Sequence, residues 1–449
     1  MDFSQLKQIK PIYLIIGGVV LSVIVLILIF GLLQTNTITS ANITFWGFED
    51  EEVYRDALLN IRAKYPINVT YAKKSPENYE KELLNAMASG QGPDVFPIHN
   101  AWLPRFSDKI ASAPTELISM KQYYDTFVDV ATQDFISEGY IWAVPLYVDS
   151  LALYWNKDLF NTAGIPEPPK TWDAFLEDVE KITKRDDAGN IILSGAALGA
   201  GANVDNASDI LSLLMMQTGA QMVNDSKTKA TFNLGMVVEG REYKPGAAAL
   251  EFYTDFANPQ KKVYSWNVKM INSRESFLRG KAAMMFDYST AASEIIKESP
   301  YLNFSIAGAP QIKETAVAVN YADYWANAVW SGSKAQSQAW QFILYLAEKE
   351  NAKAYIQKVK KPTSRRDLIS SQQSDQYLSA FATGALSARS WYQADNVSIA
   401  KIFEQMIDAV ITGQATINEA VERGVGQVNI LMEEKSGNKA PANVPSLFE

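Results

Sequence analysis

Short apolar runs alternate with amphipathic segments through the first part of this chain. Residues 43–48, 67–72 and 94–98 have the apolar content of buried strands, whereas 49–65 and 77–89 place apolar residues at helical spacing. The first of these helical segments opens with acids and closes with bases, which matches the helix dipole. Strand, helix, strand, helix and strand at this spacing predict a parallel α/β sheet with right-handed crossovers.

The alternation continues along the chain, with more helices than strands. Helical periodicity predicts further helices at 120–133, 171–183, 208–219, 246–256, 335–348, 399–412 and 417–434. Strands are predicted at 140–144, at the end of 276–285 and at 304–309. A chain of 449 residues is long enough for two large lobes rather than one core, so we expect a two-lobe α/β protein.

Local signals refine three boundaries in this pattern. Thr171 precedes Trp172 and Asp173 and is a candidate N-cap, and Ser208 is a candidate N-cap for the next helix. Residues 195–206 are rich in Gly, Ala and Asn and predict a loop.

The N-terminal segment is apolar enough to span a membrane. Residues 12–33 carry no charge, and as a helix they would be ~33 Å long, enough for a hydrocarbon core of ~30 Å. Lys7 and Lys10 precede them, which predicts a cytoplasmic N-terminus. A cleaved signal peptide is the alternative, but 39–41 is a poor cleavage site. We therefore expect a cytoplasmic segment at 1–11, a single-pass transmembrane anchor at 12–33 and a tether at 34–42. The remainder of the chain would lie on the extracytoplasmic side of the cell membrane.

Composition excludes several classes of function. The net charge of −9 and the lack of a long basic run argue against nucleic acid as a partner. The absence of cysteine excludes disulfides, thiolate metal sites, cysteine nucleophiles and a lipidated N-terminal cysteine. His99 is the one histidine, which excludes a metal site built from several histidines. We therefore expect no metal and no cofactor.

Five separated segments carry a resemblance to a known family. They are GQGPDVF at 90–96, VPLYVDSLALYWNKDLF with PPKTWDAF within 144–175, FLRGKAAMMF at 277–286, PTSRRD at 362–367, and SWYQAD at 390–395 with ITGQATINEAV after it. In this order and spacing they resemble the family 1 extracellular solute-binding proteins, the maltose-binding-like sugar receptors of ABC importers. The resemblance covers nearly all of 43–434.

The resemblance implies a type II periplasmic-binding-protein clamshell. Lobe one would comprise 42–147 plus 324–358, and lobe two 148–323 plus 359–434, followed by a tail at 435–449. The ligand would lie between the lobes, where the carboxyl ends of open α/β sheets bind ligands. The implied function is capture of a sugar or oligosaccharide by a monomeric receptor, which delivers it to ABC-transporter permease subunits without catalysis.

A sugar-binding site needs aromatic, acidic and amide side chains, and several of these lie near predicted strand ends. Aromatic planes stack on sugar rings, and carboxylates and amides bind hydroxyl groups. The 10 Trp and 21 Tyr residues suit this chemistry, although large cores use aromatics too. By their match to the family's ligand loops, hinge and aromatic positions, the expected ligand contacts are Phe48, Glu49, His99, Asn100, Trp102, Tyr147, Asp149, Tyr288, Trp391 and Tyr392. Asn203 and Asp205 are added from the Gly-rich loop before a helix, and Tyr324 and Trp325 from the second lobe crossing.

Several of these residues have structural alternatives. Asp149 sits at the mouth of an apolar strand, where a carboxylate costs free energy unless it is satisfied, and it could serve the hinge or a cap. Glu49 could simply start a helix, and Asp205 or Asn206 could cap one. Trp391 could pack in the core.

Other functions stay open at this stage. The fold could serve a glycan-binding sensor or adhesin without transport, or a receptor for a polyol, a glycerol phosphate or a polyamine. A glycoside hydrolase would need two carboxylates ~5–10 Å apart, and no signature in the sequence pairs them. The expected contacts include several acids and no Lys or Arg, which disfavours an anionic ligand and leaves a cationic one open.

Overall fold

The computed structural model describes residues 21–22, 40–313, 315 and 317–435. The predicted cytoplasmic segment 1–11 and the predicted tail beyond Lys435 lie outside these residues. So does the predicted 12–33 anchor, apart from Leu21 and Ser22. Among the described residues, the structure contains no helix with the length and apolar character needed to cross a membrane.

The first apolar core is built on a mixed sheet. Its strands are β1 (Ala41–Gly47), β2 (Ile67–Lys73), β3 (Val95–His99), β4 (Ile110–Ala111), β7 (Val144–Pro145) and β16 (Trp325–Trp330). The order is β2-β1-β3-β16-β4, and β7 pairs with β16. β1 runs parallel to β2 and β3, as predicted. β16, a strand that the sequence pattern did not predict, runs antiparallel to β3 and makes the sheet mixed. β16 arrives from the second core, and no βαβ crossover sets its direction.

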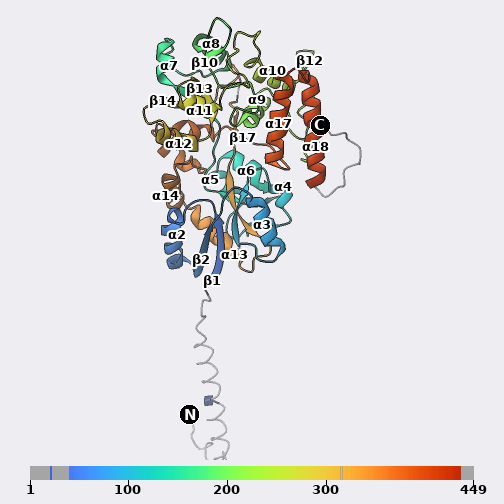
Figure 1. Cartoon of the computed structure of the whole chain (residues 1–449). Helices are drawn as coiled ribbons and strands as arrows, with labels where there is room; N and C mark the ends of the chain where they lie inside the picture. Colours follow the sequence, from blue (N-terminus) through green and yellow to red (C-terminus); the bar gives the residue numbers. More distant parts are fainter. Residues whose placement is uncertain (1–20, 23–39, 314, 316, 436–449) are drawn as a thin grey trace, which may run out of the picture.

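Helices and short strands surround this sheet. They are α2 (Glu51–Lys64), α3 (Tyr79–Ala88), α4 (Leu103–Phe106), α5 (Met120–Thr126), α6 (Asp129–Phe135), β5 (Ile136–Ser137), β6 (Tyr140–Ile141), α13 (Gln336–Leu346) and α14 (Lys349–Val359). In Figure 1 the N-terminal blue elements and the orange α13 lie together in the lower half of the molecule.

The predicted helix at 120–133 is two helices, α5 and α6. Ser119 begins α5 with a capping box. The break falls at Phe127 and Val128, where the Val128 N–H donates to the Ser364 carbonyl at 3.0 Å and Phe127 bridges Arg365. A segment more than two hundred residues away thus interrupts the helix, and local periodicity could not reveal that contact. The predicted strand at 140–144 is likewise divided between β6 and β7.

The second core is built on a smaller antiparallel sheet. β8 (Ala152–Asn156) is its central strand, between β13 (Met284–Asp287) and β14 (Phe304–Gly308), and all of β8 is buried. The surrounding helices are α7 (Lys157–Thr162), α8 (Trp172–Ile182), α9 (Ala207–Gln217), α10 (Pro245–Asp255), α11 (Ser273–Leu278), α12 (Thr290–Glu298), α17 (Asn396–Ile411) and α18 (Ile417–Lys435). Two small hairpins are β9 (Lys184–Arg185) with β10 (Ile191–Leu193), and β11 (Met236–Val238) with β12 (Arg241–Tyr243).

One of the two predicted caps is confirmed. Thr171 caps α8 by accepting the Ala174 N–H at 3.3 Å. Ser208 lies inside α9, and Asn206 is the N-cap there. Asn206 adopts a left-handed backbone and makes no capping bond with its side chain. The sequence alternative that placed a cap at Asp205 or Asn206 is therefore correct in position.

The chain passes between the two cores at closely spaced points. Val148 packs in the first core and Leu151 in the second, whereas Tyr321 packs in the second and Ala322 in the first. The changes of core fall between 148 and 151 and between 321 and 322, whereas the lobe boundaries predicted from the sequence are at 147–148 and 323–324. Figure 1 shows the two bodies one above the other, with α17 and α18 beside the upper body.

The segment 359–434, expected wholly in lobe two, is shared between the cores. Leu368, Ile369, Ala382, Ala385 and Ala388 pack in the first core, and residues from Trp391 onward pack in the second. The remaining elements lie here and at the crossing: β15 (Asn320–Tyr321), η2 (Arg366–Leu368), α15 (Ile369–Gln372), α16 (Ser379–Gly384) and β17 (Ala388–Arg389).

Candidate ligand-binding site

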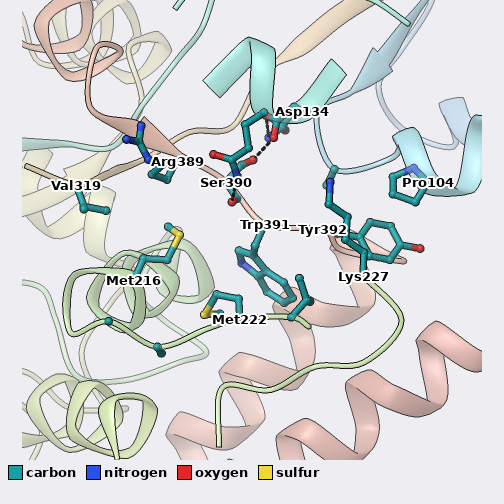
Figure 2. A pocket seen from close by; sticks show the side chains of 16 residues that line it. Pro104, Asp134, Met216, Met222, Lys227, Val319, Arg389, Ser390, Trp391 and Tyr392 are labelled. Carbon is teal, nitrogen blue, oxygen red and sulfur yellow. Dashed lines mark hydrogen bonds between the residues drawn. The ribbon is translucent and has the colours of Figure 1, made fainter. Parts of the chain in front are cut away.

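A cleft with a volume of about 390 Å³ lies between the two cores. Its size falls in the range of small-molecule sites, roughly 300–1,000 Å³. Figure 2 shows the side chains that enclose it. The first core contributes Asn100, Ala101, Pro104, Gln133 and Asp134. The remaining lining residues are Met216, Gly219, Ala220, Met222, Val223, Lys227, Val319, Arg389, Ser390, Trp391 and Tyr392.

Asp134, in α6, organises the polar side of the cleft. Its carboxylate accepts hydrogen bonds from the Tyr324 hydroxyl at 2.7 Å, from Asn100 Nδ2 at 3.3 Å and from the Ser390 hydroxyl. Burial raises the pKa of Asp134 to about 6, and these hydrogen bonds oppose that rise. The neighbouring Gln133 donates to the Ser390 carbonyl at 2.8 Å. These bonds hold β17 and the segment after it against α6.

Trp391 and Tyr392 form an aromatic part of the lining. The Trp391 indole stacks on Phe403 with the ring centroids 5.8 Å apart, and its Nε1 donates to Ser212 Oγ at 3.2 Å. Trp391 is buried, so core packing accounts for most of its surface, whereas Tyr392 is half-buried. An aromatic wall opposite amide and hydroxyl groups is the combination that a sugar requires.

A second, much smaller pocket of about 30 Å³ lies beside the chain crossing. Four predicted ligand residues line it: Phe48, Glu49, Tyr147 and Trp325. Glu49 pairs with Lys361 at 2.9 Å, and the Lys361 ammonium lies 4.2 Å from the centroid of the Tyr147 ring. Burial lowers the pKa of Lys361, but Tyr147 and Glu49 outweigh it and raise the pKa above its ordinary value. The space holds about one water molecule, too little for a sugar ring.

His99, Trp102 and Trp325 form an aromatic cluster, and Trp325 also lines the second pocket. The Trp325 ring centroid lies 5.1 Å from each of the other two rings. His99 Nδ1 accepts the Ala101 N–H at 3.2 Å, so in the neutral ring the proton is on Nε2, which lies 2.6 Å from Asp323 Oδ1. Trp102 Nε1 donates to Asn396 Oδ1 at 3.1 Å, which joins the first core to α17.

Asp149 lies at the crossing and lines neither pocket. It is buried, and it accepts hydrogen bonds from the Ser289 hydroxyl at 2.6 Å, the Ser289 N–H at 3.2 Å and the Ser150 N–H at 3.0 Å. Burial raises its pKa to about 7, and the bonds from Ser289 and Ser150 oppose the rise. Donors of Ser289 and Ser150 therefore satisfy this carboxylate within the protein.

Three further predicted contacts bond within the second core. Asn203 donates to the Asn267 and Met270 carbonyls and accepts from Trp266 Nε1. Asp205 accepts from Ser273 Oγ at 2.8 Å and Asn272 Nδ2 at 3.0 Å, at the start of α11. The Tyr288 hydroxyl donates to Asp209 at 2.7 Å. Burial, followed by the nearby charge of Asp323, raises the pKa of Asp209 to about 7.

The structure therefore divides the predicted contacts. Asn100, Trp391 and Tyr392 line the large cleft, and the Tyr324 hydroxyl donates a hydrogen bond to Asp134, which also lines it. Sequence reasoning missed Gln133, Asp134, Met216, Met222, Lys227 and Arg389. Asp134 lies one residue beyond the helix predicted at 120–133, and the two cations carry no local signal of a cleft.

Comparison with known proteins identifies the family. Residues 61–353, more than half of the chain, match the family model of bacterial extracellular solute-binding proteins. The chain belongs to this family of binding proteins. Sugar-binding proteins are among its relatives, in agreement with the resemblance that the motifs carry.

Individual relatives are distant. Binding proteins of Brucella abortus and Brucella suis are 23% identical over 272 residues, which are 60% of this chain and 62% of theirs, so the chain spans less than two thirds of their length. The diacetylchitobiose binding protein DasA of Streptomyces coelicolor is 25% identical over 317 residues, 68% of this chain and 69% of DasA.

Solved structures show the same fold. The cyclic alpha-maltosyl-1,6-maltose binding protein of Arthrobacter globiformis has a TM-score of 0.73 at 17% identity, over 88% of this chain and 99% of that protein. The fold is the two-lobe α/β clamshell of type II periplasmic binding proteins, as expected.

Proposed function

We propose that this chain is a membrane-tethered extracytoplasmic receptor that captures a sugar or oligosaccharide and delivers it to the permease of an ABC importer. The observation that carries this proposal is the cleft between the cores, with Trp391 and Tyr392 opposite Asn100 and Gln133. A ligand there would contact both cores and would favour their closure, because only differential affinity shifts such an equilibrium. The sugar specificities of the relatives support the ligand class.

Binding is tested by titration calorimetry of the purified full chain with a panel of neutral and acidic oligosaccharides. We expect saturable binding at one site and a loss of roughly tenfold in affinity for Tyr392→Ala, equivalent to about 1.4 kcal/mol. Tyr301→Ala is the matched control, since Tyr301 is 97% exposed and lies outside the cleft lining. No binding to any saccharide, with binding to another class of solute, would refute the sugar assignment.

Tethering and transport need separate tests. We expect alkaline carbonate to leave the chain in the membrane fraction, because 12–33 would remain as an uncleaved anchor. A mature protein that starts after position 40 would show a cleaved signal peptide instead. Loss of sugar uptake on deletion of the gene supports delivery to an importer, whereas intact uptake would favour a glycan sensor or adhesin. Light scattering checks the expected monomer.

A further inference from the structure

Two cationic side chains, Lys227 and Arg389, line the interlobe cleft. Figure 2 shows them on either side of Ser390. Asp134 is the one acid of the lining. Its carboxylate already accepts three hydrogen bonds from Tyr324, Asn100 and Ser390, so it has little capacity left for a cation. The charge of Lys227 also acts on Asp134, without an ion pair, so the lining carries two positive groups against one acid.

Arg389 is the better placed of the two cations. It is half-buried at the end of β17, which pairs with β15 and so fixes its backbone. Within the described part of the chain, its guanidinium makes one hydrogen bond, from Nη1 to the Ala388 carbonyl at 2.9 Å, and no ion pair. A guanidinium has five N–H donors in a rigid fork that matches carboxylate and phosphate oxygens. A half-buried fork with most of its donors unused is a ready site for such a group.

Lys227 is presented by a braced turn. Val223 and Ala230 bridge at its base, and the Asn224 side-chain oxygen accepts the N–H groups of Thr228 at 2.8 Å and Lys229 at 2.9 Å. Lys227 has a φ of 54°, in the left-handed region, which is unfavourable for a residue with a side chain. Its ammonium has no ion pair or hydrogen bond among the described residues. A strained position held by its neighbours at the edge of a ligand cleft suggests a functional role.

We propose that the captured saccharide carries an acidic group, a carboxylate or a phosphate, which Arg389 binds through its guanidinium fork while Lys227 supplies a second positive charge. The inference rests on the proposed function and specifies its ligand class. It reverses the expectation from sequence that an anionic ligand is disfavoured. That expectation depended on the ligand contacts predicted from the sequence, and neither cation is among them. The neighbouring acids Asp209 and Asp323 are not among the residues that line the cleft, so they add no negative charge to its wall.

Matched pairs of saccharides test the proposal on the full chain by titration calorimetry. Digalacturonate against galactobiose isolates a carboxylate, and maltose 6′-phosphate against maltose isolates a phosphate. We expect one acidic member to bind at least tenfold more tightly than its neutral partner. Because Lys227 is exposed, that preference should shrink as salt is raised. The pair that shows the preference distinguishes carboxylate from phosphate.

Variants assign the preference to the two cations. Arg389→Gln should reduce the affinity ratio between the acidic and the neutral saccharide to about threefold or less. Lys227→Gln should reduce this ratio in part. Arg389→Lys should not restore it fully, because an ammonium lacks the fork. Lys229→Gln is the control, since Lys229 is in the same turn but outside the lining. Unfolding midpoints of all variants are measured alongside, and Lys227→Gln should fold normally because its side chain is exposed.

Each outcome separates this inference from the proposed function. Neutral saccharides that bind as tightly as their acidic partners overturn the inference and leave the sugar receptor standing. A preference that survives both Arg389→Gln and Lys227→Gln overturns it as well. Failure of every saccharide to bind overturns the proposed function, and the inference with it.

Discussion

Asp149→Asn tests the account of the chain crossing most directly. Asp149 is 4% exposed, and burial raises its pKa to about 7, although Ser289 and Ser150 donate to it and Lys361 adds a favourable charge. In an unfolded chain an aspartate has a pKa of about 3.9. The folded protein therefore retains a proton on Asp149 at pH values where the unfolded chain has lost it. Stability must then fall as the pH rises from about 4 through 7.

The magnitude follows from the two pKa values. Between pH 5 and pH 8, a group that titrates at about 7 when folded and about 3.9 when unfolded costs on the order of 2–3 kcal/mol of unfolding free energy. Asparagine cannot ionise, and its Oδ1 can still accept a bond from Ser289. Between pH 5 and pH 8, we therefore expect the unfolding free energy of Asp149→Asn to fall by about 2–3 kcal/mol less than that of the wild type.

Urea unfolding of the full chain at pH 5, 6, 7 and 8, followed by tryptophan fluorescence, measures the effect. Asp134 and Asp209, whose pKa values are also raised, are present in both proteins and cancel in the comparison. Ser289→Ala provides a test of opposite sign. It removes a donor to the ionised carboxylate, so it should destabilise more at pH 8 than at pH 5. Identical pH profiles for the wild type and Asp149→Asn would refute the reasoning, because Asp149 would then be ionised in the folded state.

Two further substitutions probe contacts that the fold creates. Trp102→Phe keeps an aromatic ring but removes the N–H that donates to Asn396 across the cores, so sugar affinity measured by calorimetry should fall roughly fivefold, or about 1 kcal/mol. Arg274→Met leaves the carboxylate of Asp287 buried without its partner, which lies 2.8 Å from the guanidinium, so the unfolding free energy from urea titration should fall by roughly 3 kcal/mol.

Each of these substitutions has a matched control. Trp142→Phe removes an indole N–H that bonds to Ser137 within the same core, and it should leave sugar affinity unchanged. Arg279→Met removes an exposed side chain from its ion pair with the half-buried Glu275, which should cost less than 1 kcal/mol. Equal effects of the test and control variants would contradict the roles given to Trp102 and Arg274.

The sequence by itself determined the family, the α/β class and most of the helices. Each of these depends on contiguous residues. The motifs at 90–96 and 144–175 lie within single segments, α8 and its Thr171 cap are local features, and the acids and bases at the ends of α2 complement its dipole. Such local patterns can be recognised without knowledge of distant contacts. The predicted family was accordingly confirmed across most of the chain.

The tertiary structure decided which side chains share a space. β16 joins the first sheet antiparallel because it arrives from the other core, and the contact with 363–365 breaks the helix expected at 120–133. The same long-range packing satisfies Asp149 with Ser289 and leaves Arg389 at the cleft with most of its donors unused. A residue's type and local pattern indicate what it can bind, whereas its partner depends on which distant segments the fold brings beside it.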